Sequence, residues 1–511
     1  MRESNHWSRG FAPLREWMGL VSAASLYSCA LVIFLACFAS PRAYGDVGVV
    51  LNESLDTSVA RITGSGHSAV YLSNICPESP IKLRLCRPGE LGSVISNYTT
   101  LGEDQPFEWN VVPLSIYLYG VEDPENRPIF GAEKVKTALE ERYREKYLSA
   151  YCSIQSCRTS NSAEWREMVG ATLSRSIYIF IVNTTVEQDR ELVNEFNSLP
   201  NVNHFNGVTR NCATFTQRVV NTYFPHAASR DYINDFGIAS PKAIARSFTH
   251  YAEKHPDAHF RVLHIAQVPG TIKRSTEARA GTEQLYHSKK LLVPMLIFAD
   301  HELPFVAASY LLTGRFNPEH ELEEHPTAQA TDISYQIKEA KSEKDIARAE
   351  ELEAVEGEER EQIVGTSLEW KQFRADFDSV VEEAISQQII SDRGELHRVF
   401  KRLDHEGTPR IDAQGGLWME ILSRGEISTI GLSASNIFAR GTDRQAQYEL
   451  VLARTEYVLK APKHSRETML EFKHDWALLQ NARMERAVST AHATAPPASN
   501  SPSAVSSPSL D

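Results

Sequence analysis

Residues 64–72 read GSGHSAVYL and place His67 between a glycine-containing segment and a β-rich run. Residues 68–72 are predicted to form a strand, because aliphatic and aromatic residues of this kind favour extended backbone. His67 would then lead that strand. A histidine in this position can project its imidazole into a cleft and act as the general base for a thiol or hydroxyl nucleophile. Taken by itself, it is more often an ordinary residue at the end of a strand.

A second motif, RNCATF, supplies a nucleophile. Asn211 is a good N-cap residue, so Cys212 would take the first helical position. Phe215, Val219 and Tyr223 follow at helical spacing and predict an amphipathic helix. Unpaired amides and the helix dipole at this end stabilise a thiolate, and we therefore expect them to lower the pKa of Cys212. The alternative is a small, buried, unreactive cysteine at a helix start.

The first 45 residues have the layout of a secretory signal. Three arginines precede residues 17–40, which carry no charge, and the stretch AYG follows at 43–45. We expect cleavage just before Asp46 or Val47. An uncleaved anchor is the alternative, because the uncharged stretch can span the roughly 30 Å of a bilayer's hydrocarbon core. In both cases the chain folds outside the cytoplasm, in the periplasm or cell envelope, and an anchor would associate it with the membrane.

The seven cysteines then separate into groups. Two lie in the export segment, and the other five are Cys76, Cys86, Cys152, Cys157 and Cys212. Cys76 and Cys86 flank a predicted hairpin loop, and Cys152 and Cys157 are five residues apart after a predicted helix. Both pairs are expected to form local disulfides, since local closure needs little rearrangement of the chain. Cys212 is left over, which indicates intermolecular pairing or a free reactive thiol.

Charge and composition divide the chain further. The net charge of −13 over 511 residues excludes a general nucleic-acid binder, which needs a basic face. Residues 319–361 hold 15 acidic and five basic side chains, a local −10 that leaves only −3 for the rest. We interpret 317–364 as an acidic helical connector, 365–485 as a mostly α-helical C-terminal domain and 486–511 as a disordered Pro/Ser-rich tail.

Residues 46–316 are expected to form one α+β domain. The predicted strands are 68–72, 81–85 and 176–182, with 111–118 as a further candidate, and the predicted helices are 132–150, 187–198 and 212–223. Residues 291–312 are apolar at both ends, but Asp300, His301 and Glu302 interrupt them. Charges at mid-bilayer are costly, so a buried strand or helix pair is the favoured interpretation.

GHSAVYL, followed 145 residues later by NCATF, resembles the circularly permuted NlpC/P60-like branch of the papain-fold superfamily. The nearest pattern is that of bacterial domain-of-unknown-function families with a Gly-His strand and an Asn-Cys helix start. In this branch the histidine precedes the cysteine, as it does here. The resemblance covers roughly residues 47–270, extends at most to 316 and implies a permuted papain-like domain with an antiparallel sheet and helices.

The resemblance also implies roles. Cys212 would be the nucleophile and His67 its base, with the Cys212 amide at the Asn211-capped helix start as an oxyanion donor. A third polar group normally orients the histidine; Glu90 is our candidate, with Asn74 and Glu78 as alternatives. The expected activity is an exported cysteine hydrolase or acyltransferase that acts on a peptide, another amide or a lipid ester, with a cell-wall peptide as the leading substrate. The alternative is a non-catalytic envelope or interaction protein that retains the papain-like shell. A membrane-bound acyltransferase is a third reading.

No cofactor or metal is expected from the sequence. His320 and His325 are five residues apart, whereas two zinc ligands on one helical face are four apart. His255 and His259 have that spacing, but Pro256 interrupts the helix between them. Neither pair predicts a metal centre.

Overall fold

The structure is a computed structural model. It describes residues 45–55, 66–97, 107–151, 164–202, 209–235, 237–287, 308, 310–311, 315–325, 367–423, 425–460, 472–473 and 475–484. The chain divides into two compact units, Met1–Tyr44 and Gly45–Asp511, and all the described residues belong to the second. The export segment, the Cys152/Cys157 pair, nearly all of 291–312, most of the acidic connector and the tail lie outside them.

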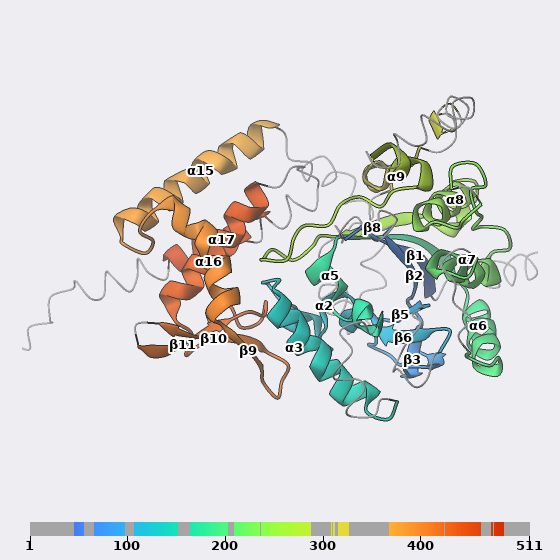
Figure 1. The fold of residues 1–511 in the computed structure, drawn as a ribbon, viewed down its shortest axis with the longest axis horizontal. Coiled ribbons are helices and arrows are strands. Elements are labelled where there is room, and N and C mark those ends of the chain that lie inside the picture. Colours follow the sequence, from blue (N-terminus) through green and yellow to red (C-terminus); the bar gives the residue numbers. More distant parts are fainter. Residues whose placement is uncertain are drawn as a thin grey trace, which may run out of the picture. The chain divides into compact units, whose positions relative to one another are not determined.

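A six-stranded antiparallel sheet has the strand order β6-β5-β2-β1-β7-β8 (Figure 1). Its strands are β1 (Gly45–Asn52), β2 (His67–Leu72), β5 (Ser93–Ser96), β6 (Asn110–Pro113), β7 (Ile177–Thr184) and β8 (Arg261–Ile265). β1 pairs with β2 along one edge and with β7 along the other. Seven of its eight residues are buried, as expected for a strand covered on both faces. The predicted α+β class with an antiparallel sheet is confirmed.

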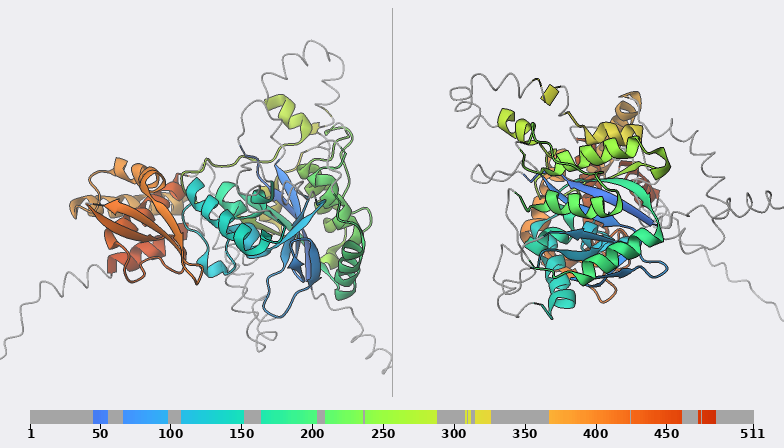
Figure 2. Two further views of the ribbon diagram at one scale, coloured as in Figure 1. Left: turned by 60° about the horizontal axis from the view of Figure 1, so that its bottom comes forward. Right: turned by 90° about the vertical axis from the view of Figure 1, so that its right-hand side faces the viewer.

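Helices cover both faces of the sheet (Figure 2). One face packs against α6 (Val186–Ser198), α7 (Cys212–Tyr223) and α8 (Pro241–Glu253), and the other against α2 (Leu114–Tyr119), α3 (Glu133–Tyr143) and α5 (Ala171–Ser174). Val70 and Leu72 of β2 belong to the first core, whereas Ala69 and Tyr71 belong to the second. Successive strand residues point to opposite faces, and this alternation decides which side each residue of the site faces.

Several local predictions hold. β2, β7, α6 and α7 lie where the sequence pattern placed them, and the helix predicted at 132–150 is α3 followed by a π-helical turn, η2 (Arg144–Leu148). Residues 111–118 are not one strand, because β6 ends at Pro113 and α2 begins at Leu114. Proline has no N–H to continue the ladder. All six residues of α2 are buried, so the apolar run after the proline serves a core helix.

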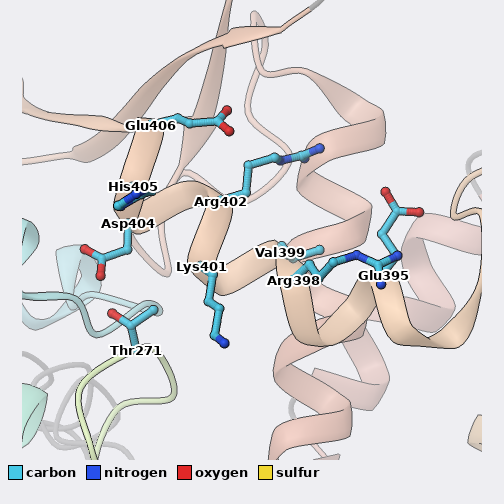
Figure 3. A pocket seen from close by; sticks show the side chains of 9 residues that line it. All are labelled: Thr271, Glu395, Arg398, Val399, Lys401, Arg402, Asp404, His405 and Glu406. Carbon is cyan, nitrogen blue, oxygen red and sulfur yellow. The ribbon is translucent and has the colours of Figure 1, made fainter.

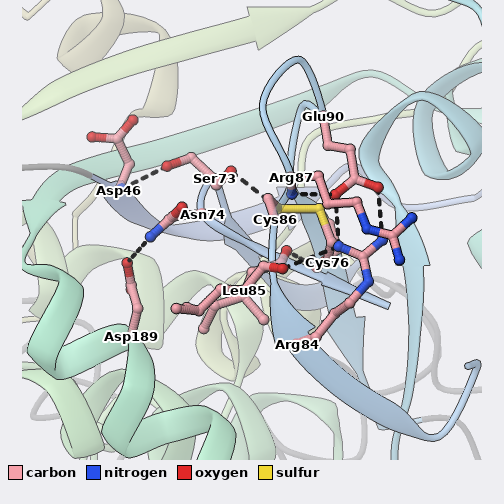
Figure 4. The surroundings of a disulfide bond; sticks show 12 residues. Asp46, Ser73, Asn74, Cys76, Arg84, Leu85, Cys86, Arg87, Glu90 and Asp189 are labelled. Atoms are coloured by element: carbon pink, nitrogen blue, oxygen red, sulfur yellow. Dashed lines mark hydrogen bonds and ion pairs between the residues drawn. A yellow bond between two sulfur atoms is a disulfide. The ribbon is translucent and has the colours of Figure 1, made fainter. Parts of the chain in front are cut away.

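A two-stranded hairpin beside the sheet carries the disulfide. It consists of β3 (Ile75–Ser79) and β4 (Lys82–Leu85), and Cys76 and Cys86 are bonded across it with their Cα atoms 4.9 Å apart. This predicted disulfide is confirmed (Figure 4). Such a cross-link stabilises a fold mainly by restricting the unfolded chain.

The C-terminal region is helical, as expected, but it also contains a sheet. Its helices are α15 (Ser367–Ser386), α16 (Arg393–Glu406) and α17 (Arg444–Leu459), and its strands are β9 (Thr408–Ile411), β10 (Leu417–Ser423) and β11 (Glu426–Gly431). The strands pair antiparallel in the order β11-β10-β9. Leu417, Met419 and Ile421 are buried at alternate positions of β10, a period of two that the helical interpretation overlooked.

The C-terminal region packs on the face of the main sheet that α2 and α3 cover. Phe130 and Phe400 lie with their ring centroids 5.5 Å apart in a shared hydrophobic core. The buried Arg454 guanidinium forms an ion pair with Asp475 at 3.0 Å and also donates to the carbonyl of Ile129. The main-chain N–H of Ile129 donates to Leu432 at 2.8 Å.

Two further helices of eight or fewer residues, α9 (Gly281–His287) and α12 (Pro318–Glu324), follow β8 along the chain. Three short 3₁₀ helices, η1 (Pro124–Asn126), η3 (Glu164–Met168) and η4 (Pro256–Ala258), are also present among the described residues before the C-terminal region. Within the part of the chain that the structure describes, none of the helices is both long and apolar enough to cross a bilayer.

Asp475→Asn tests the buried ion pair. We expect the free energy of unfolding to fall by about 3–5 kcal/mol, because the substitution removes the negative charge of Asp475 from the buried Arg454 guanidinium. Glu78→Gln is the matched control, since its ion pair with Lys82 is about half exposed on both sides and should contribute under about 1 kcal/mol. Urea denaturation of both variants measures the difference, and equal losses would contradict the assignment.

Candidate functional site

The chain enters β2 through a glycine that cannot be replaced without strain. Gly66 has a φ of +69°, and a Cβ at this position would lie 2.2 Å from the carbonyl oxygen of Asn52. Asn52 is the register partner of His67, the first residue of β2. Only glycine combines the left-handed backbone with this close approach. The Gly-His pair of the sequence motif therefore has a structural cause.

The imidazole of His67 is held by a serine from the neighbouring strand. Its Nε2 lies 2.9 Å from the hydroxyl of Ser96, the last residue of β5, and Ser96 is fully buried. Burial, and secondly the positive charge of Arg175, lower the pKa of His67 from 6.5 to about 3. The ring is consequently neutral near pH 7, the form in which an imidazole can accept a proton.

Cys212 occupies the first position of α7, as predicted. The Asn211 side chain caps the helix by accepting from the N–H of Thr214 at 3.0 Å, and it also donates to the carbonyl of Ala239 at 2.9 Å. The second contact fixes the cap to the segment that precedes α8. Cys212 is the only free cysteine among the described residues, and it is partly accessible.

The pKa of the Cys212 thiol differs from the expectation. Hydrogen bonds from the backbone and hydroxyl of Ser68, and from the amides of Ala213 and Cys212 itself, lower this pKa, but desolvation is the larger effect and raises it overall. The helix N-terminus acts in the predicted direction, yet it does not overcome burial. The resting sulfur is a thiol rather than a thiolate.

Ser68 places Cys212 beside the start of β2. Its hydroxyl accepts from Thr216 of α7 at 3.2 Å, so this side chain faces the helix that carries the thiol. His67, the preceding residue, directs its Nε2 to Ser96 of the neighbouring strand. The structure thus brings the sulfur to the residue next to His67, at the end of the sheet where the two motifs meet.

A buried polar cluster supports this end of the sheet. The amide of Asn52 donates to the Tyr117 hydroxyl at 2.8 Å and to the carbonyl of His67 at 3.3 Å. Burial raises the pKa of Tyr117 to about 12, and the charge on Cys212 adds to the rise, which puts the phenol within electrostatic range of the sulfur. Arg175, buried and paired with Glu167, acts on both the phenol and the imidazole.

Sequence reasoning missed these supporting residues. Asn52, Ser96, Tyr117 and Arg175 come from separate elements, and none belongs to a motif. The only local signal was a polar residue at a strand end, as in NES at 52–54 and SNY at 96–98. Their proximity depends on how β1, β2, β5 and α2 pack.

Glu90, the predicted third group, forms hydrogen bonds beside the disulfide hairpin (Figure 4). Its carboxylate accepts two hydrogen bonds from the Arg84 guanidinium, both at 2.7 Å, and one from the N–H of Arg87 at 2.6 Å. The bond to Arg84 is the largest of the effects that lower the pKa of Glu90. Ser96 is the side chain that the structure places on the His67 ring.

A separate cavity of about 630 Å³ lies along α16 in the C-terminal region (Figure 3). Arg398, Lys401 and Asp404 line it, and Thr271 approaches it from the segment after β8. The hydroxyl of Thr271 is buried without a hydrogen-bond partner. Neither Cys212 nor His67 lines this cavity, so it is distinct from the site at the start of β2.

Comparison with known proteins finds no relative: no family model, no curated protein and no solved structure matches the chain. Functional assignment therefore depends on the residues themselves.

Acid should destabilise the protein through His67. The unfolded chain takes up a proton there near pH 6.5, whereas the folded chain does so only near pH 3. The stability due to the neutral ring is therefore complete above pH 6.5 and is lost as the pH falls toward 3. The loss is at most about 1.4 kcal/mol per pH unit, an upper bound because His67 is partly accessible.

Urea denaturation at about pH 7.5 and about pH 5 measures this effect, and His67→Gln should remove up to roughly 2 kcal/mol of the acid-induced loss. His405→Gln, which changes an exposed histidine on α16, is the control and should leave the loss unaltered. An identical pH dependence in the wild type and His67→Gln would contradict the lowered pKa of this imidazole.

Proposed function

We propose that this protein is a thiol-dependent hydrolase or acyltransferase that cleaves an amide or ester with Cys212 as nucleophile and His67 as base. The observation that carries the proposal is the position of the free thiol: it begins a capped helix and is hydrogen-bonded to Ser68, the neighbour of His67. The permuted NlpC/P60-like arrangement also has a histidine strand followed by a cysteine helix. The packing of α7 on β2 through Thr216 and Ser68 is consistent with it.

The protonation states define how the proposed reaction begins. Both partners are neutral at rest, because burial raises the pKa of Cys212 and lowers that of His67. The thiol proton therefore passes to the imidazole as the sulfur attacks the substrate carbonyl carbon, and the carbonyl π electrons move to its oxygen. In this proposal the N–H of Cys212, at the helix start, donates to the oxyanion.

The proton then returns to the leaving group. The imidazolium of His67 protonates the departing amine or alkoxide as its bond to carbon breaks, which leaves a thioester on Cys212. In a hydrolase, water attacks the thioester while His67 takes its proton; in an acyltransferase, an acceptor amine or hydroxyl does so. Regeneration of the thiol completes the cycle.

Ser96 is the positioning residue in this proposal. Its hydroxyl holds Nε2 of His67 in the resting structure, so the ring must either use its other nitrogen or release Ser96 before it takes the thiol proton. In this proposal Ser96 takes the orienting role that the sequence suggested for Glu90, whose carboxylate forms an ion pair with Arg84.

An exported location and a cell-wall peptide substrate belong to the same proposal. The Cys76–Cys86 disulfide supports export, because disulfides persist in oxidising compartments. Peptides, other amides and lipid esters all contain the carbonyl that the proposed chemistry requires, and a protein delivered to a bacterial envelope meets peptide cross-bridges there.

Two measurements test Cys212 as the nucleophile: alkylation of its thiol and the activity of variants. Iodoacetamide at neutral pH should label Cys212 in the native protein, as mapped by peptide mass spectrometry, and Cys212→Ala should abolish hydrolysis of an activated ester and of cell-wall peptides. His67→Gln should lower kcat/KM by about 10²–10⁴, whereas His405→Gln should not. Full activity in Cys212→Ala, or an unlabelled Cys212 in the folded wild type, would refute the proposal.

A non-catalytic interaction protein is the second candidate, and the raised pKa of Cys212 favours it. The rate of Cys212 alkylation as a function of pH separates the two. An enzyme should show a midpoint that moves when His67 becomes Gln, because the base assists ionisation. A midpoint at or above the ordinary thiol value of about 8.5 that is identical in both proteins would support the interaction protein.

A further inference from the structure

The ends of two helices meet far from the Cys212 motif in sequence. α8 ends at Glu253, and His325 follows α12 as its C-cap. The carbonyl of His325 accepts from the N–H of Val262 at 2.8 Å, which fixes the end of α12 to β8. The His325 ring also packs edge-on against Phe260, with the centroids 5.0 Å apart.

Three metal-ligating side chains gather at this junction. One ligand atom each from Glu253, Glu321 and His325 lies within 4.8 Å of the other two. Glu321 and His325 are four residues apart, the spacing that puts two side chains on one side of a helical turn. The third donor, Glu253, comes from another helix and lies 68 residues before Glu321 in the sequence. The sequence pattern of His320 and His325 therefore could not indicate this cluster.

One carboxylate oxygen of Glu321 lacks a hydrogen-bond donor among the described residues. The residue is only 8% exposed, and its Oε2 is buried with no hydrogen-bond partner. Burial and the negative charges of Glu253 and Glu324 raise its pKa. A buried carboxylate oxygen without a donor is costly, and a cation held by the three side chains would satisfy it.

We propose that Glu253, Glu321 and His325 form a divalent transition-metal site, with Zn²⁺ as the preferred ion. Two carboxylates and one imidazole are ligands that Zn²⁺ accepts, and three protein ligands leave a fourth position for water. Hard cations such as Mg²⁺ and Ca²⁺ prefer a shell made only of oxygen.

The donors are close enough to share one ion. Their ligand atoms lie within 4.8 Å of one another, and Zn–N and Zn–O bonds are about 2.0–2.2 Å long. Glu253 is exposed at the end of α8, so its side chain can adjust to a bound ion. His250 lies 3.1 Å from the Glu253 carboxylate and would orient it from behind.

The ion would join three elements. It would connect the end of α8 to α12, and through the Val262 hydrogen bond it would also secure α12 on β8. Leu322 of α12 is buried in the same hydrophobic core as α7 and α8. The site would therefore stabilise the helical layer that carries Cys212, and it stands independently of the proposed catalysis.

Titration of the tag-free full chain with Zn²⁺ tests the site. Isothermal titration calorimetry should give about one equivalent bound, and Zn²⁺ should raise the Tm. Glu321→Gln and His325→Gln should each weaken binding beyond the roughly 10–100-fold that a supporting residue costs. Glu324→Gln is the matched control, since Glu324 is on the same helix but is paired with His320 at 3.2 Å.

Two further measurements separate this site from others. The Cys212→Ala protein should bind Zn²⁺ with unchanged affinity, and Co²⁺ in place of Zn²⁺ should give a visible spectrum without a thiolate charge-transfer band. Equal Zn²⁺ affinity in Glu321→Gln, Glu324→Gln and the wild type would overturn the proposal. A Co²⁺ spectrum dominated by thiolate would do the same, as would the absence of Zn²⁺ binding to the wild type.

Discussion

The pairing of β1 with β2 is the constraint on which the candidate site depends. It aligns Asn52 with His67 at the end of the ladder and thereby fixes the face of the sheet that each residue of β2 meets. Ser68 consequently faces Thr216 of α7, whereas His67 is bonded to Ser96. A slip of one residue would exchange the two faces. The register is protected because β1 is buried between β2 and β7, so a slip would also move its valines out of both cores.

Desolvation affects the pKa of Cys212 more strongly than the helix N-terminus does, and it also dominates the pKa of His67. It moves the pKa of Cys212 up and that of His67 down, and Arg175 pushes the histidine further in the same direction. A pre-formed thiolate–imidazolium pair would need each of these shifts reversed. At neutral pH the thiol and the imidazole are therefore both uncharged, and a protonated thiol is less prone to oxidation than a thiolate.

What could be predicted from the sequence was local. The start of a strand could be predicted from Gly66 and His67, and a capped helix from Asn211 and Cys212, because these features depend on neighbouring residues. The hairpin disulfide could be predicted because its two cysteines are only ten residues apart. The supporting groups could not be found in this way, because their contacts join segments distant in the chain. Glu90 illustrates the difference: it was chosen for its place after the histidine strand, but its carboxylate forms an ion pair with Arg84. The C-terminal sheet was missed because the helical interpretation was extended over all of 365–485, and the period of two in β10 was overlooked.

The two candidate catalytic residues are supported from opposite faces of one sheet by different parts of the chain. The core behind Tyr117 continues into the C-terminal region, where Arg454 reaches the carbonyl of Ile129. The core behind Cys212 continues through α8 into α12 and ends near the Glu253 cluster. The C-terminal region therefore packs behind the surroundings of His67, and α12 packs behind those of Cys212. Because close-packed interiors transmit strain, we expect the C-terminal region to affect the surroundings of His67 and α12 to affect those of Cys212, although neither of these two distal elements contributes an atom to the proposed reaction.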